Sequence, residues 1–480
     1  MYFSNLYPTP KVSSEFESER FHFSSSVTAT VCGLNSVETE RVKYLWYRFS
    51  CNASVLNINT GENPYCFQIG KASCELEATD AYAIHVDASG VCVVGKDAEG
   101  LMSGIKTLVQ LICPEVLDEG MESLYITAAD VHDAPEIDFR AIHLCVFAGT
   151  KLHSIEQAIH LAGFLKMTHV ILEFWGTLQY ECQPALYWKD RSFSKAEVRE
   201  LVQLSNSYGM EMIPMINHFG HAAQARRCHG RHVVLNQNPR LSRLFEPDGW
   251  TWCVSNPDTY KLLAEMRAEQ MELFGDGKYF HLGFDEADSF ATCDFCNKHV
   301  PHELLAEYLD NLTKDILKAG RRPIIWHDML IRQEDFPLNE EYKMTANGAH
   351  KDTYRVLDFL DKRLIIADWN YNYKENYNPT TPYFIDKGFD TLICPWDDKE
   401  NIRSICSDVK KYGAKGVIMT TWNHSKAFLR NASYWANCAW SASENNFGAG
   451  SATRGRLLGR LCDGNGSFED YGWGFCDAEL

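Results

Sequence analysis

The sequence lacks the long hydrophobic run that a membrane-spanning helix needs. No stretch of its 480 residues approaches the roughly 18 consecutive apolar residues typical of such a helix. The N-terminal segment also lacks the basic start and the apolar core of a secretory signal peptide. We therefore expect neither a membrane span nor a secretion signal.

Positive charge is also scarce. The chain has 46 lysines and arginines against 64 aspartates and glutamates, a net charge of −18. Such a surface repels phosphate backbones, so we expect no nucleic-acid partner. The hydrophobic fraction is 45% and the charged fraction 23%, which excludes a mainly disordered chain and allows a large buried core.

The cysteines are numerous but lack the pattern of a disulfide framework. There are 17 of them, and an odd number cannot all pair within one chain. Several stand singly in apolar runs, as buried free thiols do. This usage is typical of a reducing compartment, and we expect a cytoplasmic protein.

One pair of cysteines has the spacing of metal ligands. Cys293 and Cys296 form a Cys-x₂-Cys pair, followed by two histidines, and could begin a zinc site. The sequence has no second pair of this kind, although Cys228 or His229 could complete the ligand set. We therefore expect no cofactor, and keep a structural zinc at Cys293 and Cys296 as the less favoured alternative to a loop of free thiols.

The first part of the chain predicts a small α+β domain at residues 1–133. Residues 82–95 alternate between apolar and polar around a turn, as a β-hairpin does. In the following segment, 96–115, apolar residues recur at helical spacing until Pro114. Proline among acidic residues near position 135 marks the boundary to the next domain.

The rest of the chain alternates short apolar segments with helical patterns, which predicts a (β/α)₈ TIM barrel over residues 134–445. The segment 342–347 is an alternative ninth strand, and the glycine-rich tail 446–480 is expected to pack on the barrel. Ser154 with Gln157, and Ser194 with Glu197, predict capping boxes. The predicted strands are 140–146, 169–174, 211–216, 279–283, 323–326, 364–368, 391–394 and 416–420.

Catalytic residues of such barrels lie where the strands end. Asp285 and Glu286 directly follow the fourth predicted strand and a glycine. A lone Asp-Glu pair is most often an exposed turn. Its position at the mouth of a barrel favours a functional role here.

Aromatic and polar residues follow the other strands. Strands five to eight end in tryptophan, which indicates an aromatic-walled pocket suited to the apolar faces of sugar rings and a small acyl group. The tryptophans are Trp326, Trp369, Trp396 and Trp422, and the polar candidates are Arg140, Glu173, His218, His221, Asp328 and Tyr371.

The segment HLGFDE (281–286) resembles the His-x-Gly-x-Asp-Glu signature of glycoside hydrolase family 20, the β-N-acetylhexosaminidases. Residues 82–112 resemble the small N-terminal domain of that family, and 213–221 resemble its loop that ends in Pro-Gly-His. Residues 324–330 and 367–373 resemble the fifth and sixth strand ends of a bacterial branch. The resemblance implies a (β/α)₈ barrel and a retaining exo-β-N-acetylhexosaminidase. Its substrate would be an oligosaccharide or glycoconjugate with a terminal β-linked GlcNAc or GalNAc.

In this family the nucleophile is the carbonyl oxygen of the substrate's own 2-acetamido group, and an oxazolinium intermediate forms. Most glycosidases instead use two carboxyl groups of the enzyme, one as the acid and one as the nucleophile or base. The resemblance makes Glu286 the general acid and base, and makes Asp285 the residue that orients the acetamide and stabilises its positive charge. It implies contacts to the sugar hydroxyls for Arg140, to the acetamido methyl for Trp326, Trp369 and Trp422, and to the acetamido oxygen for Tyr371. It places His221 near Glu286, with Glu173 behind it, while Asp328 could supply a further polar contact.

Departures from the family pattern keep alternatives open. Asn423 and His424 stand where an acid often follows the last strand, which leaves the choice between GlcNAc and GalNAc undecided. The basic cluster 226–232 could bind an acidic substituent, but a salt-bridged surface loop is the simpler interpretation.

Three rival hypotheses for the function stay open. They are a non-catalytic sugar-binding barrel, a hexosaminidase specific for GalNAc or a modified hexosamine, and a metal-dependent hydrolase using His218, His221, His281 and Asp285. The sequence does not indicate the oligomeric state.

Overall fold

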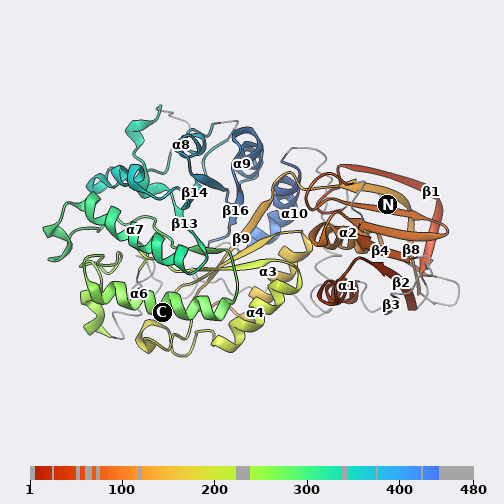
Figure 1. Ribbon diagram of the computed structural model, residues 1–480, viewed down its shortest axis with the longest axis horizontal. Helices are drawn as coiled ribbons and strands as arrows, with labels where there is room; N and C mark the ends of the chain where they lie inside the picture. Colours follow the sequence, from red (N-terminus) through yellow and green to blue (C-terminus); the bar gives the residue numbers. More distant parts are fainter. Residues whose placement is uncertain are drawn as a thin grey trace.

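The protein has two domains that lie end to end in the computed structural model (Figure 1). No helix in the described part of the chain is long and apolar enough to cross a membrane. The predicted C-terminal tail, 446–480, lies outside that part. The structure describes residues 6–23, 26–49, 55–59, 67–71, 76–116, 122–222, 238–337, 344–374, 377–422 and 425–442.

The N-terminal domain is an eight-stranded sheet with two helices, in the order β1-β8-β5-β6-β4-β2-β3, with β7 paired to β8. The predicted hairpin is confirmed as β5 and β6, and the predicted helix as α2, which ends at Leu111. The elements are β1 Val12–Phe23, β2 Ser26–Cys32, α1 Ser36–Phe49, β3 Val55–Asn59, β4 Phe67–Lys71, β5 Tyr82–Asp87, β6 Gly90–Gly95, α2 Ala98–Leu111, β7 Cys113–Val116 and β8 Glu122–Asp133.

The second domain is a closed barrel of eight parallel strands, which confirms the predicted (β/α)₈ fold. All eight predicted strands are present, while residues 344–347 form no strand and 342–343 lie outside the described residues. The strands are β9 Phe139–Val146, β10 His169–Phe174, β11 Glu211–Met215, β12 Tyr279–His281, β13 Arg322–Trp326, β14 Ile365–Trp369, β15 Asp390–Cys394 and β16 Gly416–Thr420.

Helices surround the barrel strands (Figure 1). The capping box at Ser194 and Glu197 is confirmed, but the one at Ser154 is wrong, because α3 begins two residues earlier with Lys151 as its N-cap. Ser154 is instead buried within the first turn. The helices are α3 Leu152–Phe164, α4 Lys195–Ser207, α6 Pro257–Phe274, α7 Pro301–Lys318, α8 Thr380–Asp386, α9 Lys399–Tyr412 and α10 Ser425–Ser441, with a 3₁₀ segment at His350–Phe359.

The barrel interior is apolar at its base and aromatic at its mouth. Small and branched side chains such as Ala141, Ile171 and Ile365 fill the interior and exclude a pore. Trp326 and Trp369, the last residues of β13 and β14, close the same cluster at the carboxyl ends of the strands. The interior therefore presents aromatic rings to the end of the barrel where β12 delivers Asp285.

A buried polar network joins the two domains. Asp133 Oδ2 of β8 accepts hydrogen bonds from the Tyr82 hydroxyl and from Trp440 Nε1 of α10, both at 2.9 Å. Lys166 Nζ, from the loop after α3, donates to the same Tyr82 hydroxyl at 2.9 Å. Buried polar groups that all find partners fix one arrangement of the elements that carry them. The network thus ties the sheet of the first domain to the amino-terminal end of the barrel.

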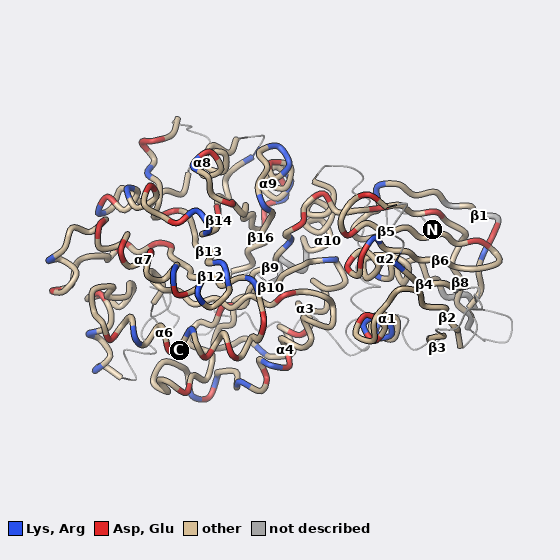
Figure 2. The backbone as a smooth tube through the Cα atoms, in the orientation of Figure 1, with Lys and Arg blue, Asp and Glu red and all other residues tan. Residues whose placement is uncertain are grey.

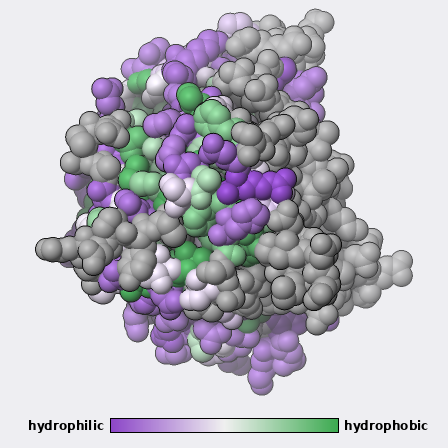
Figure 3. Space-filling model, turned by 90° about the vertical axis from the view of Figure 1, so that its right-hand side faces the viewer, coloured by the Kyte–Doolittle hydropathy of each residue, from purple (hydrophilic) through white to green (hydrophobic). Residues whose placement is uncertain are grey.

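The described charges are interspersed rather than gathered by sign, although acids outnumber bases (Figure 2). On the end of the molecule formed by the first domain, hydrophobic side chains lie among hydrophilic ones (Figure 3). Val12, Val37 and Tyr47 are exposed hydrophobic residues of that domain. Scattered apolar side chains of this kind are normal on a protein surface.

Asp408 on α9 should make the fold less stable at alkaline pH. Its carboxyl group is buried, and burial raises its pKa to about 6. Because the folded pKa lies above the unfolded value of about 4, the cost of burying the charge is fully present above pH 6 and fades as the pH falls below it. We expect Asp408→Asn to raise the free energy of unfolding at pH 8, by at most about 3 kcal/mol, and to have little effect near pH 4.5.

Melting temperatures at both pH values check this expectation. Glu400→Gln is the matched control, because Glu400 is an exposed acid on the same helix. An equal gain for Asp408→Asn at the two pH values would contradict a cost of charge burial.

Candidate active site

The segment after β12 is held in a strained backbone conformation. Gly283, Phe284 and Glu286 have positive φ angles of 70°, 95° and 47°. Non-glycine residues rarely adopt this region, and such strain is concentrated at functional sites. A Cβ atom at Gly283 would lie 2.0 Å from Asn217 Oδ1, so the close approach of the two loops requires glycine there. The backbone thus turns sharply just before it presents Asp285 and Glu286.

Asp285, Glu286 and His221 form a compact charged group. His221 Nε2 lies 3.1 Å from Asp285 Oδ2 and 3.4 Å from Glu286 Oε2. The side chain of Asp285 is only 5% exposed, whereas that of Glu286 is 44% exposed. The two adjacent carboxylates therefore lie in different environments, one enclosed and one open to a ligand. This difference is what two separate chemical roles require.

The pKa directions follow from this enclosure. Burial raises the pKa of Asp285 above its ordinary value, and the positive charge on His221 works against that rise. Burial works to lower the pKa of His221, but the carboxylates of Asp285 and Glu286 outweigh it and raise the pKa well above its ordinary value. The carboxylates thus favour the protonated form of His221, and the charge on His221 favours the ionised form of Asp285. Asp285 Oδ1 is buried and accepts no hydrogen bond within the described part of the protein.

The loop that carries His221 reaches the pair through a glycine. A Cβ atom at Gly220 would lie 1.9 Å from the carbonyl oxygen of Asp285, which no side chain can tolerate. His221 itself has a positive φ of 56° and packs between two indole rings, with centroid distances of 4.3 Å to Trp250 and 5.5 Å to Trp175. Trp250 Nε1 also donates to the carbonyl oxygen of Glu286. The loops after β11 and β12 are thus interlocked.

Asp328 positions the backbone of Glu286. Its Oδ2 atom accepts hydrogen bonds from the backbone N–H of Glu286 at 3.0 Å and from Asn347 Nδ2 at 2.8 Å, and Oδ1 accepts from Trp369 Nε1 at 3.3 Å. The residue is fully buried, and burial, together with the charge of Asp285, raises the pKa of Asp328 to about 7. The carboxylate of Asp328 thus holds the backbone of Glu286 and two side chains of the site, and its expected direct contact with a sugar stays a prediction.

Glu173 does not support His221. Its Oε2 atom lies 2.9 Å from Nε2 of His143, and its Oε1 atom accepts from Asn217 Nδ2 at 2.5 Å. All three residues come from the carboxyl-terminal halves of neighbouring strands or the loops just beyond them. The predicted pairing with His221 is corrected to contacts with His143 and Asn217, because these two residues take the two carboxylate oxygens of Glu173.

Arg140 lies at the opposite end of the barrel from Asp285. It is the second residue of β9, and its guanidinium donates to the backbone carbonyl oxygens of Ile137, Asp138 and Lys166. The guanidinium also lies over the ring of Trp440, 5.0 Å from the centroid. The expected contact with sugar hydroxyls is therefore wrong: this arginine belongs to the interface between the domains.

The predicted aromatic wall is present. Trp326 and Trp422 lie 5.9 Å apart, and Trp369 and Tyr371 lie 5.2 Å apart, measured between ring centroids. Trp422 Nε1 donates to the Tyr371 hydroxyl at 2.6 Å. That hydroxyl also lies 3.3 Å from Thr420 Oγ1, which donates its own proton to the carbonyl oxygen of Pro395 at 2.9 Å. The bond from Trp422 uses the tyrosine oxygen as acceptor, so the tyrosine proton is directed to Thr420 Oγ1 or to a ligand in its place. Burial raises the pKa of Tyr371 well above its ordinary value and keeps that proton in place.

Several residues of the site were not predicted. Trp250 and Trp175 enclose His221, Asn217 and His143 hold Glu173, and Asn347 holds Asp328. Trp175 and Asn217 each follow a barrel strand closely, which is the signal that could have found them. Trp250 and Asn347 lie in long connections, where the sequence gives no periodic signal.

Two groups of side chains in the described part of the protein bring three metal-ligating atoms within 4.8 Å of one another. One is His143, Cys145 and Glu173 in the barrel, and the other is Cys253, Cys293 and Cys296 beside it. The predicted metal-dependent set of His218, His221, His281 and Asp285 is not among them. The described geometry thus gives the metal-dependent hypothesis no ligand set.

Two family models match the chain. The catalytic domain of glycosyl hydrolase family 20 matches residues 176–436, and domain 2 of that family matches residues 4–134. The first match spans more than half of the sequence, so the chain belongs to glycoside hydrolase family 20. The resemblance of residues 281–286 to the family signature is thereby confirmed.

Relatives are distant in sequence but share the fold. The beta-hexosaminidase of Porphyromonas gingivalis is 24% identical over 367 residues, covering 68% of this chain and 45% of that protein. The chain therefore spans less than half the length of this curated relative. The β-N-acetylhexosaminidase of Bacteroides fragilis superposes with a TM-score of 0.71 at 17% identity, covering 95% of this chain and 94% of that one. The exo β-N-acetylglucosaminidase of Vibrio harveyi, solved with N-acetylglucosamine, gives 0.71 at 14% identity over 96% of this chain and 77% of that one.

Proposed function

We propose that this protein is a retaining exo-β-N-acetylhexosaminidase that releases a terminal β-linked GlcNAc or GalNAc. The observation that carries the proposal is the environment of the adjacent carboxyl groups of Asp285 and Glu286. Asp285 is enclosed, with Oδ1 buried and accepting no bond from the described residues, whereas Glu286 is open at the mouth of the barrel. Membership of glycoside hydrolase family 20 supports the same reaction.

Glu286 acts first as a general acid. Its carboxyl group donates a proton to the glycosidic oxygen as the bond to the anomeric carbon breaks, and the resulting carboxylate later takes a proton from water. Asp328 holds the backbone N–H of Glu286, and Trp250 holds its carbonyl oxygen, so the residue is fixed from both sides. This fixation keeps the carboxyl group aligned with the leaving oxygen.

The substrate's acetamido carbonyl oxygen attacks the anomeric carbon from the other face. Asp285 Oδ1 accepts the acetamido N–H, and the negative charge stabilises the positive oxazolinium that forms. Tyr371 donates its proton to the carbonyl oxygen, and Trp326, Trp369 and Trp422 enclose the methyl group. Because the substrate supplies the nucleophile, the reaction needs no cofactor.

A panel of p-nitrophenyl β-glycosides tests the proposal. We expect turnover of the GlcNAc or GalNAc glycoside, and a kcat/KM on the glucoside lower by at least about 10³, because a hydroxyl at C2 cannot replace the acetamido nucleophile. Comparable hydrolysis of the glucoside would refute the substrate-assisted mechanism. Binding of N-acetylhexosamine without hydrolysis of any glycoside would favour the non-catalytic sugar-binding barrel.

The comparison of GlcNAc with GalNAc in the same panel decides the sugar at C4. Asn423 and His424, which follow β16 where the family often has an acid, lie outside the described residues. A hexosaminidase restricted to GalNAc would hydrolyse only the GalNAc glycoside, in which the C4 hydroxyl is axial.

We further propose that the protein works in the cytoplasm on small glycans, an inference supported by the eleven free thiols among the described residues. Cell fractionation with an antibody against the protein tests this location.

Gly220→Ala should damage the site without greatly damaging the fold. The added Cβ would meet the carbonyl oxygen of Asp285 at 1.9 Å, so one of the two loops must shift. We expect kcat/KM to fall by roughly 10²-fold, the effect of a displacement of about 1 Å on catalytic groups. Gly388→Ala is the control, because Gly388 has a positive φ of 85° but no atom lies within 4 Å of an added Cβ. This substitution should lower the free energy of unfolding by about 1 kcal/mol and leave kcat/KM unchanged. Equal activities of the two variants would contradict the close contact.

A further inference from the structure

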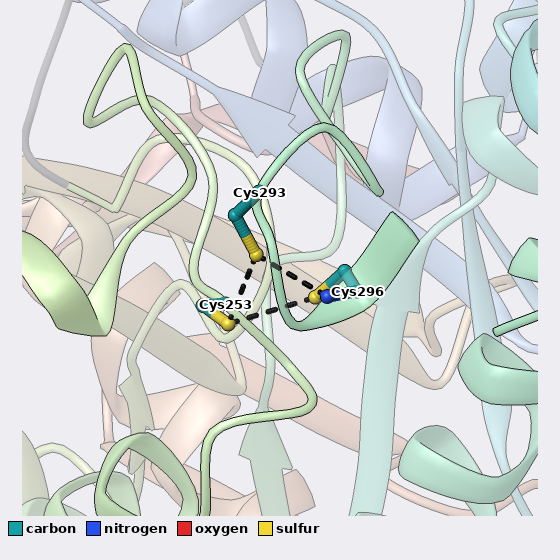
Figure 4. A group of neighbouring side chains, drawn as sticks. All are labelled: Cys253, Cys293 and Cys296. Atoms are coloured by element: carbon teal, nitrogen blue, oxygen red, sulfur yellow. Dashed lines mark hydrogen bonds between the residues drawn. The ribbon is translucent and has the colours of Figure 1, made fainter. Parts of the chain in front are cut away.

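Three cysteine side chains converge in the connections that follow β11 and β12 (Figure 4). Cys253 lies in the connection before α6, and Cys293 and Cys296 lie in the connection between β12 and α7. The Sγ atom of Cys253 is 3.3 Å from that of Cys293 and 3.6 Å from that of Cys296. All three Sγ atoms lie within 4.8 Å of one another. The Cys-x₂-Cys pair thus gains a third thiol from forty residues earlier in the chain.

The sulfur separations match a shared metal ion better than a disulfide. A disulfide brings two sulfurs to about 2.05 Å and has no place for a third. A tetrahedral zinc ion with bonds of about 2.3 Å to sulfur holds its thiolates about 3.8 Å apart. The two distances of 3.3 and 3.6 Å approach that value, and the sulfurs point toward one another in Figure 4.

The surroundings of the thiols are built like the outer shell of a metal site. The backbone N–H of Cys296 points at the Sγ atom of Cys293, at 3.3 Å, as a donor that stabilises a thiolate. The buried Glu246 carboxylate accepts the backbone N–H groups of Ala291, Thr292 and Cys293. The cysteine loop is thereby held from behind, and its sulfurs keep their positions.

We propose that Cys253, Cys293 and Cys296 bind a structural zinc ion as three thiolates. Each thiol gives up its proton when it coordinates the metal, so binding releases protons. No fourth cysteine, histidine or carboxylate of the described residues joins the group, and the remaining coordination position goes to a ligand from outside it. Zinc fits because three soft sulfur ligands in a mostly buried setting select it over magnesium or calcium.

This ion would connect the two loops that build the candidate active site. Cys253 directly follows Trp252, whose Nε1 atom donates to the carbonyl oxygen of Asn217 at 2.8 Å. The loop of Cys293 and Cys296 also carries Asp285 and Glu286 a few residues earlier. Neither carboxylate belongs to the group of described ligand atoms. The ion holds in place the backbone that positions them, independently of the reaction that the site performs.

Elemental analysis of the full-length protein, purified without chelators or added metal, tests the proposal. We expect one zinc per chain in the wild type, and a loss to below a tenth of that amount in Cys293→Ser and in Cys296→Ser. Cys406→Ser is the matched control, because Cys406 is a thiol on α9, buried like Cys296, that belongs to no such group of described ligands. It should keep the zinc.

Cobalt substitution keeps the test independent of how well the variants fold. Wild-type protein stripped with a chelator and then given Co²⁺ should show thiolate-to-cobalt charge-transfer bands in the near ultraviolet, and should melt several degrees higher when Zn²⁺ is restored. A purified wild type that holds no zinc and shows neither response would overturn the proposal. So would mass spectrometry that finds Cys253 disulfide-bonded to Cys293 in the native protein. Neither readout depends on hydrolysis, so failure of the proposed function would leave this result unchanged.

Discussion

Glu286→Gln should lower kcat/KM for N-acetylhexosaminide hydrolysis by roughly 10²- to 10⁴-fold, the range for removal of a general acid. Glutamine keeps the size of the side chain and the backbone contacts of residue 286 to Asp328 and Trp250. It removes the proton that the leaving oxygen needs. The melting temperature should change little, because the side chain is 44% exposed and carries few of the contacts that hold the loop.

The dependence of the activity loss on the leaving group shows whether Glu286→Gln removes a proton donor or distorts the site. A 2,4-dinitrophenolate leaves without protonation, so the loss in Glu286→Gln should be much smaller on the dinitrophenyl glycoside than on a chitobiose or methyl glycoside. Asp288→Asn is the control, since Asp288 is an exposed acid in the same loop and should keep wild-type rates. An equal loss on all leaving groups would remove the acid role from Glu286.

The barrel could be predicted from sequence because its strands are short, apolar and buried on both faces. β13 and β14, for example, are mostly apolar segments that each end in tryptophan, and polar residues follow each of them. The catalytic pair could be predicted for a related reason. Asp285 and Glu286 adjoin one strand end, so no long-range contact had to be inferred to place them together.

Contacts between strands and loops could not be predicted in the same way. Arg140 was expected at the site because it adjoins a strand, but it is at the amino-terminal start of β9, and only the opposite end faces the site. Glu173 pairs across to His143 on the neighbouring strand, a contact that depends on side-chain direction rather than on sequence spacing. Cys253 joins Cys293 across forty residues that include α6 and β12, and both cysteines lie in irregular connections whose path no periodicity fixes.

Asp285→Asn should lower kcat/KM by roughly 10²- to 10³-fold, the magnitude for removal of one preorganised electrostatic contact. Asp285 neither attacks the sugar nor protonates the leaving group in the proposed mechanism. Its buried Oδ1 atom accepts the acetamido N–H, and its charge stabilises the oxazolinium. The amide removes that charge from an enclosed position, where water cannot compensate for its loss. It also removes the partner of His221, 3.1 Å away, whose raised pKa depends on the charges of Asp285 and Glu286.

The pattern across substrates distinguishes this role from that of Glu286. Because Asp285 acts on the nucleophile, the loss in Asp285→Asn should be the same on the dinitrophenyl glycoside as on glycosides with poor leaving groups. His221→Gln separates the two effects of the substitution, since it removes the histidine but leaves the carboxylate, and it should cost less than Asp285→Asn. A much smaller loss of kcat/KM in Asp285→Asn on the dinitrophenyl glycoside than on the other glycosides is the pattern expected of Glu286→Gln. That result would make Asp285 the proton donor, and the roles of the two neighbouring carboxyl groups would have to be exchanged.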